Sequence, residues 1–206
     1  MKTYQVVGIG NAIVDVLTRA DDNFLELMGI TKGIMQLVER DRAEVLYGAM
    51  ESRVQAPGGS VANTLAGLGN LGLRTGFIGR VHDDFLGRFY AAEMEKIGTT
   101  FANPPVAGGE LPTSRSMIFV APDGERSMNT YLGACVELGP EDVEDDVVAG
   151  AKVTYFEGYL WDPPLAKDAI RMAAKIAHDN GCLLYTSDAA DDAFRSSLRL
   201  RPRSRN

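Results

Sequence analysis

The sequence has few cysteines and no excess of positive charge, and each shortage excludes a class of protein. Only two of its 206 residues are cysteines, Cys135 and Cys182, which can form neither a disulfide framework nor a cysteine-based metal site. The net charge is −7 at pH 7, so nucleic acid is not an expected partner. With 45% hydrophobic residues, the composition is that of an ordinary globular protein.

Long apolar segments are also missing. No apolar run has the length needed to span a bilayer, so we expect no membrane partner. Residues Met1-Lys2-Thr3 lead directly into a short strand-like run rather than into a signal peptide. We therefore expect a cytoplasmic protein whose 206 residues form one domain.

The chain is organised around the stretch Pro57-Gly58-Gly59-Ser60-Val61-Ala62-Asn63. Two adjacent glycines permit unusual backbone angles and the close approach of a ligand. Apolar residues at helical spacing follow, so the pattern predicts a glycine turn that opens a helix. The N–H groups of that helix N-terminus, together with Ser60 and Asn63, would suit a small hydroxylated or anionic ligand. The simpler alternative is a turn and a helix packed on a sheet.

The first strand is expected at residues 4–10 and ends in the pattern Gly8-x-Gly10. Ile13 occupies the third glycine position of a dinucleotide fingerprint, and the β-branched run after it disfavours a helix, so nicotinamide binding is not favoured. Asp15 stands inside that apolar run. A buried carboxylate needs partners, and two neighbouring sugar hydroxyls could supply them. An aspartate that caps a turn is the alternative.

Strands and helices are then expected to alternate, which favours an α/β fold with a mostly parallel sheet. The helix over 40–50 is expected to bury Val45, Leu46 and Met50. Two strands joined by the turn Pro122-Asp123-Gly124-Glu125 interrupt the alternation and predict a small separate sheet. The other expected helices are 21–28, the helix after the glycines, 85–97, a short acidic one from 139 and 163–180; the other expected strands are 33–38, 73–81, 113–121, 126–132 and 152–157.

Residues 182–206 differ from the rest of the chain. Another core strand is due after Gly181, but the segment shows no periodicity and contains five arginines and three aspartates. It also resembles the translation of a transposon-derived adapter used in preparing sequencing libraries. We therefore expect a native part over 1–181 and a non-native tail over 182–206. An ordinary flexible basic tail is the alternative.

Taken together, these motifs resemble the PfkB (ribokinase-like) family of sugar and nucleoside kinases, most closely its adenosine-kinase-like members. The resemblance covers residues 4–181. Val61, Leu65 and His82 depart from it, since smaller residues are usual at these three places. The motifs that carry it are Gly8–Asp15, Gly58–Asn63, Phe77–Val81, Asp84–Gly87 and the hairpin Thr113–Leu132.

The resemblance implies a three-layer α/β/α fold with a small β-sheet lid formed by residues 33–38 and 113–132. It implies a substrate site for a nucleoside or sugar, in which Asp15 accepts hydrogen bonds from two vicinal hydroxyls. The other residues implied to bind substrate are Asn11, Gly58, Gly59, Ser60 and Asn63, with Ile13, Met35 and Tyr159 as apolar walls against a base.

The resemblance also implies ATP and Mg²⁺ as cofactors. The family's catalytic aspartate belongs to a later Gly-Ala-Gly-Asp segment, which does not occur in this sequence. We therefore expect a kinase fold whose C-terminal part is missing, with no catalytic residue and no metal site of its own, that is inactive as written. The expected activity of the parent is phosphorylation of a primary hydroxyl, first of adenosine and alternatively of a free sugar such as ribose or fructose. A non-catalytic nucleoside-binding fragment is a third possibility, and the expected state is a monomer or homodimer.

Overall fold

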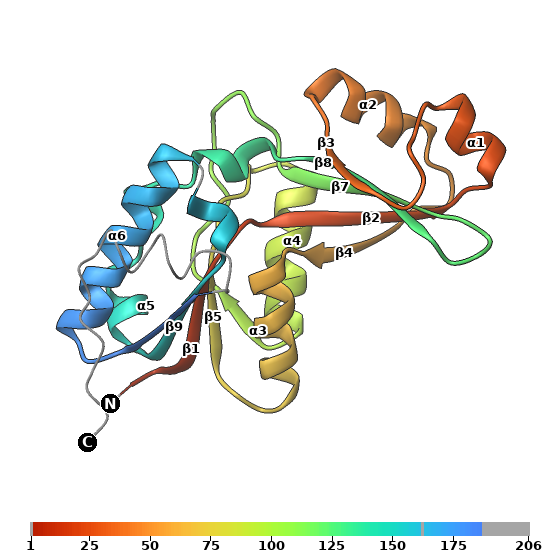
Figure 1. The fold of residues 1–206 in the computed structure, drawn as a ribbon. Coiled ribbons are helices and arrows are strands. Elements are labelled where there is room, and N and C mark those ends of the chain that lie inside the picture. Colours follow the sequence, from red (N-terminus) through yellow and green to blue (C-terminus); the bar gives the residue numbers. More distant parts are fainter. Residues whose placement is uncertain (1, 162, 187–206) are drawn as a thin grey trace.

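The computed structural model describes residues 2–161 and 163–186, which form two β-sheets joined end to end (Figure 1). The main sheet contains five parallel strands. Their order is β10 (Leu183–Thr186), β9 (Ala151–Phe156), β1 (Tyr4–Ile9), β5 (Thr75–Ile78) and β6 (Thr99–Phe101). The parallel order confirms the predicted α/β class, because such strands need crossover connections.

Helices cover both faces of the main sheet and give the predicted three layers (Figure 1). One face packs against α3 (Ser60–Asn70) and α4 (Phe85–Lys96), and the other against α5 (Asp145–Ala149) and α6 (Pro164–Asp179). The alanines of α6 at 173, 174 and 177 are buried, which allows that helix to approach the sheet closely. Short 3-10 helices accompany these elements: η1 (Gly133–Glu137), η2 (Pro140–Asp142), where the sequence predicted a short acidic helix, and η3 (Gly158–Trp161).

The second sheet, which we call the lid sheet, projects away from the main sheet (Figure 1). Its order is β3 (Met35–Leu37), β8 (Arg126–Tyr131), β7 (Ser114–Val120), β2 (Ile13–Arg19) and β4 (Val54–Gly58). Strands β7 and β8 form the predicted hairpin and pair in antiparallel fashion. Helices α1 (Asp22–Leu27) and α2 (Arg40–Ala49) lie on one face of this sheet only.

Four strands were not predicted. Strand β2 covers the apolar run that contains Asp15, for which no strand was predicted, and the other three are short. Strand β4 contains Pro57 and Gly58, residues typical of turns, yet it pairs with β2 at the edge of the lid sheet, where proline is tolerated. Strand β6 has only three residues. Strand β10 belongs to the segment 182–206, which was expected to be a non-native tail, and it pairs with β9. Residues 187–206 of that segment lie outside the described part of the chain.

One predicted core position is wrong. Val45 was expected to face inward from α2, but 56% of it is exposed. Leu46 and Met50 are buried as predicted, and Ala43 is buried with them. The spacing explains the error: Ala43, Leu46 and Met50 lie three and four residues apart on one helix face, and Val45 lies off that stripe.

The first strand of the main sheet approaches α3 closely. A Cβ placed on Gly8 would lie 2.4 Å from Val61 Cγ1, and one on Gly10 would lie 2.8 Å from Val61 Cβ. The two glycines therefore make room for Val61, which stands where the family pattern has a smaller residue. This close contact fixes the start of α3 against the end of β1.

Candidate functional site

The predicted substrate residues gather where the main sheet meets the lid sheet. Here β1 ends and the chain turns through Asn11 into β2, and β4 ends at the glycine pair that opens α3. Gly59 has φ +102°, a conformation that favours glycine, and a Cβ there would lie 2.3 Å from the carbonyl oxygen of Asn11. The glycine turn predicted from the sequence is therefore confirmed, and it brings the two chain segments into direct contact.

Asp15 lies beside this turn. Its carboxylate covers Gly58 so closely that a Cβ at position 58 would lie 2.5 Å from Asp15 Cγ. Asp15 is half-buried, and among the described residues no donor is hydrogen-bonded to its carboxylate. Burial raises the pKa of Asp15 to about 6, and the charge of Arg126 opposes this rise. Such a carboxylate has both oxygens available for ligand hydroxyls.

The face of the lid sheet that carries Asp15 is opposite to its covering helices. Val14 and Val16, the neighbours of Asp15 along β2, are fully buried in the cluster that includes Leu25 of α1 and Leu46 of α2. Because side chains alternate along a strand, Asp15 projects from the other face. Paired residues share a face, so Ser116 and Thr130, in register with Asp15, lie on this face too. We call it the open face.

An apolar row crosses the open face next to Asp15. The register aligns Val54, Leu17, Ile118, Met128 and Met35 across the five strands. Val54 and Met35, on the two edge strands, are 64% and 55% exposed, whereas Ile118 in the middle of the row is 2% exposed, so the exposed apolar surface of the row lies at its two ends. A carboxylate followed by apolar surface suits a molecule with a hydroxylated end and a flat apolar end.

Met35 and Tyr159 lie at the margins of the site. Met35 is on the open face but three strands from β2, which places it about 14 Å from that strand at the usual strand spacing. Tyr159 is 72% exposed in η3, two residues after Glu157. Ile13 lies two residues before Asp15 on the same face, and Asn63 is exposed on the first turn of α3. The structure thus brings five of the predicted residues into direct contact: Asn11, Asp15, Gly58, Gly59 and Ser60. The other four, Ile13, Met35, Asn63 and Tyr159, lie farther out.

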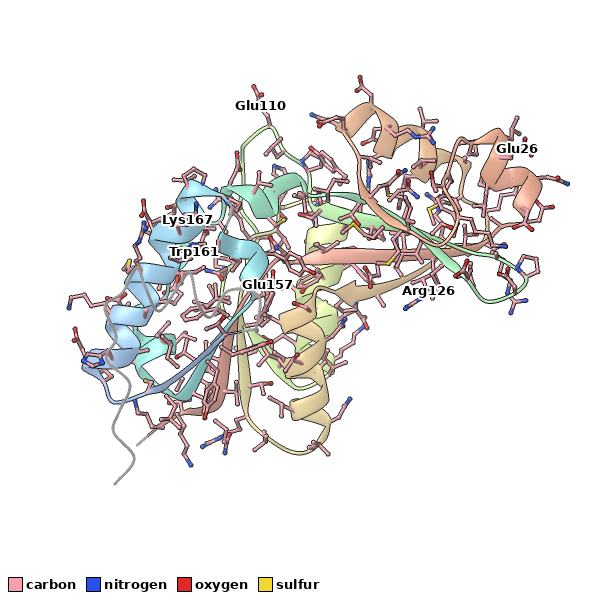
Figure 2. The ribbon with its side chains drawn as sticks, in the orientation of Figure 1. Glu26, Glu110, Arg126, Glu157, Trp161 and Lys167 are labelled. Carbon is pink, nitrogen blue, oxygen red and sulfur yellow. The ribbon has the colours of Figure 1, made fainter. Side chains whose placement is uncertain are left out.

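Ser60 has a partner within the protein. Its hydroxyl, predicted to line the ligand site, donates a 2.5 Å hydrogen bond to Glu157 Oε2. Glu157 directly follows β9, only 3% of it is exposed, and its Oε1 accepts a 2.6 Å hydrogen bond from the backbone N–H of Asn11. Figure 2 shows Glu157 at the junction of the two sheets. Sequence reasoning missed this residue, although an acid directly after a buried parallel strand was a usable signal.

Two further residues at the site were missed. Tyr90 of α4 is fully buried, and its hydroxyl donates a 3.0 Å hydrogen bond to the carbonyl of Gly58. Arg126 of β8 is exposed on the open face, towards the free end of the lid (Figure 2). The register places Arg126 four residues along β8 from Thr130, which is aligned with Asp15, so it affects Asp15 through its charge and not through a contact.

The chain belongs to the pfkB family of carbohydrate kinases. The family model, described as "pfkB family carbohydrate kinase", matches residues 23–202. This result, together with the sheet order and the lid, confirms the resemblance deduced from the glycine motifs and the hairpin.

Solved structures of family members share the fold. An adenosine kinase from Sinorhizobium meliloti is 56% identical, with a TM-score of 0.82 over 96% of this chain and 61% of that one. A probable sugar kinase from Rhizobium etli CFN 42 is 50% identical, with the same TM-score and coverage. Among curated proteins, guanosine-inosine kinase of Escherichia coli K12 is 27% identical over 161 residues, which are 75% of this chain and 37% of that protein. The chain therefore spans little more than a third of that curated relative and about 60% of the similar solved structures.

The described residues do not by themselves form a metal centre. Within residues 2–161 and 163–186, no group of three histidine, cysteine, aspartate or glutamate side chains could hold a metal ion. His82, Asp83 and Asp84 follow one another in sequence, but Asp84 caps α4 through Gly87 N–H and accepts from Thr113 N–H. In the same part of the chain, no helix is both long and apolar enough to cross a membrane.

Proposed function

We propose that this chain is the substrate-binding part of an ATP-dependent kinase that phosphorylates a primary hydroxyl of a nucleoside, with adenosine as its substrate. The observation that carries the proposal is the Asp15 carboxylate, half-buried and without a hydrogen-bonded partner among the described residues. Two vicinal ribose hydroxyls would donate hydrogen bonds to its two oxygens. These bonds would replace the hydrogen bonds to water that the carboxylate loses on burial.

The open face supports a nucleoside rather than a free sugar. The apolar row beside Asp15 would pack against a purine ring, while the diol is held at the carboxylate. A free sugar would leave this row exposed to water. The adenosine kinase of 56% identity adds support for the same substrate class.

In this proposal the chain's own residues bind and orient the substrate. Asn11 and Asp15 would fix the sugar, and Gly59 lets the backbone approach it without a side chain in the way. The lid sheet would cover the ligand and exclude water, which limits wasteful hydrolysis of ATP. ATP and Mg²⁺ are cofactors of the proposed activity. Within the part of the chain that the structure describes, no set of side chains could hold the metal ion.

A free-sugar kinase is the second candidate, favoured by the probable sugar kinase of 50% identity. Calorimetric titration of the purified chain with adenosine, 2′-deoxyadenosine and ribose separates the two. We expect adenosine to bind at least tenfold more tightly than either, because 2′-deoxyadenosine lacks one hydroxyl for Asp15 and ribose lacks the base.

Asp15→Asn should weaken adenosine binding by at least tenfold. Asp41→Asn, an exposed change on α2, is the matched control and should leave binding unchanged. Tighter binding of ribose than of adenosine would favour the free-sugar kinase as the function. Equal binding of adenosine and 2′-deoxyadenosine would contradict the role of Asp15.

A further inference from the structure

Glu157 connects three separate segments of the chain. It follows the last residue of β9, accepts from the backbone of Asn11 between β1 and β2, and accepts from the side chain of Ser60 at the start of α3. The sequence separations are 146 and 97 residues, so these contacts hold the tertiary arrangement of the site rather than a local turn.

The same carboxylate occupies the N-terminal end of α3. Gly59, the residue before this helix, has no side chain to cap it. Burial raises the pKa of Glu157, while hydrogen bonds from Ser60, from Asn11 and from the backbone of Val61 lower it. A carboxylate at this place satisfies free N–H groups and interacts favourably with the helix dipole. The anion that a helix N-terminus attracts is therefore supplied from within the protein.

Glu157 and Asp15 lie on either side of the glycine turn. Tyr90, whose hydroxyl is bonded to Gly58 between them, has its pKa raised by burial and, to a smaller extent, by the charges of Glu157 and then Asp15. Glu157 is hydrogen-bonded to Ser60 and Asn11 and Asp15 covers Gly58, so both carboxylates border the same glycine turn. A ligand that carried its own negative charge there would be repelled by two like charges.

We infer that Glu157 is a positioning residue that orders Asn11 and the start of α3 for a polyhydroxylated ligand, and that its charge restricts the site to neutral ligands. This inference rests on the proposed function, because it concerns how the same site selects its ligand. It also selects between the hydroxylated and anionic ligands that the glycine motif alone left open.

The test compares two ligands that differ in charge, adenosine and adenosine-5′-carboxylic acid, by calorimetric titration. Glu157→Gln keeps the size of the side chain and removes its charge. We expect it to weaken adenosine binding about tenfold through lost order, and to reduce the preference for adenosine over the acid about tenfold through lost repulsion. The matched control is Glu26→Gln on the exposed surface of α1, distant from the site (Figure 2), which should change neither value.

The variant Ser60→Ala separates the effect of Glu157 on the order of the site from the effect of its charge. It removes one hydrogen bond to Glu157 and keeps the carboxylate, so adenosine should bind severalfold more weakly while the preference for the neutral ligand stays unchanged. If Glu157→Gln weakens both ligands equally, or neither, the inference about charge is overturned. If Glu157→Gln does not fold, Ser60→Ala provides the test of positioning. Unchanged adenosine binding in Ser60→Ala would then contradict the inference.

The outcome for the proposed function is distinct. If the unaltered chain binds neither adenosine nor ribose, the proposed function fails. The positioning role is then judged by hydrogen exchange at the amides of Asn11 and Val61, which should be at least tenfold faster in Glu157→Gln than in Glu26→Gln. Equal exchange in the two variants would overturn it.

Discussion

The carboxylate of Asp15 rests directly on the α-carbon of Gly58, with 2.5 Å between Asp15 Cγ and the place where a Cβ of residue 58 would be. Strands β2 and β4 pair beside this contact, with Ile13 opposite Gly58. Glycine at position 58 is therefore required by the position of the proposed diol-binding carboxylate.

We predict that Gly58→Ala displaces Asp15, lowers the unfolding free energy by about 1–3 kcal/mol and weakens adenosine binding at least tenfold. Denaturant unfolding and calorimetry measure the two effects. Gly48→Ala is the matched control, because a Cβ there meets nothing within 4 Å and the residue lies inside α2. It should stabilise the protein by about 0.5–1 kcal/mol. Binding unaffected by Gly58→Ala would argue against the Asp15 site.

The raised pKa of Asp15 predicts a stability that depends on pH. Its value of about 6, against 3.8 for the unburied group, means that ionisation of Asp15 destabilises the folded state by up to about 3 kcal/mol above pH 6. The stability that the protonated form provides is complete below pH 3.8 and is lost as the pH rises through 6. Asp15→Asn should therefore raise the unfolding free energy at pH 8 and have little effect near pH 4. Urea unfolding at several pH values measures this, and a difference independent of pH would refute it.

Ligand binding should show the opposite dependence on pH. The ionised carboxylate accepts two hydrogen bonds, so adenosine affinity should increase as the pH rises through about 6 and level off above pH 7. Titration calorimetry between pH 5 and 8 is the measurement. The increase should be absent in Asp15→Asn, and an increase that persists there would assign the dependence to another group.

Tyr90→Phe tests the support beneath the glycine turn. The change removes the 3.0 Å hydrogen bond from the hydroxyl and leaves the Gly58 carbonyl without this donor. We expect the unfolding free energy to fall by about 1–2 kcal/mol, since both groups are buried. Tyr159→Phe, at a tyrosine that is 72% exposed, should change stability by less than about 0.5 kcal/mol. Equal effects of the two changes would show that the hydrogen bond contributes nothing.

We also propose from their composition that residues 182–206 are not native, although their first residues form β10 in the main sheet and the family match extends to residue 202. Resequencing of the source DNA across the codons for His178 to Asp192 is the direct test. We expect a reading frame that continues into a core strand and later a Gly-Ala-Gly-Asp segment. Confirmation of the present frame would instead leave a binding role as the remaining proposal for this chain.

Much of the fold was predictable because long periodic segments carry strong signals. The helices over 40–50, 85–97 and 163–180 and the hairpin all occur near their predicted bounds. Strands β4 and β6 were missed for physical reasons: one contains proline and glycine at a sheet edge, and the other has three residues, too few to show alternation. Their pairing comes from tertiary contacts with β2 and β5.

The candidate site was predictable in its motifs but not in its internal bonding. Residues near the glycines were identified because unusual backbone conformations require particular amino acids. Glu157 was not, because its role depends on contacts with segments 97 and 146 residues away. For the same reason the hydrogen bond from Ser60 to Glu157 could not be predicted, although Ser60 was assigned to the site from its place at the helix start and from the family resemblance.

The contact between Gly8 and Val61 has an evolutionary consequence. Gly8 leaves the space that a methyl group of Val61 fills, so the strand lacks a side chain where the helix has a larger one. Either residue changed alone would produce a collision or a void, whereas a reciprocal exchange of volume would conserve the packing. The two positions should therefore covary among family members, and a lineage with a small residue at 61 should tolerate a larger one at 8.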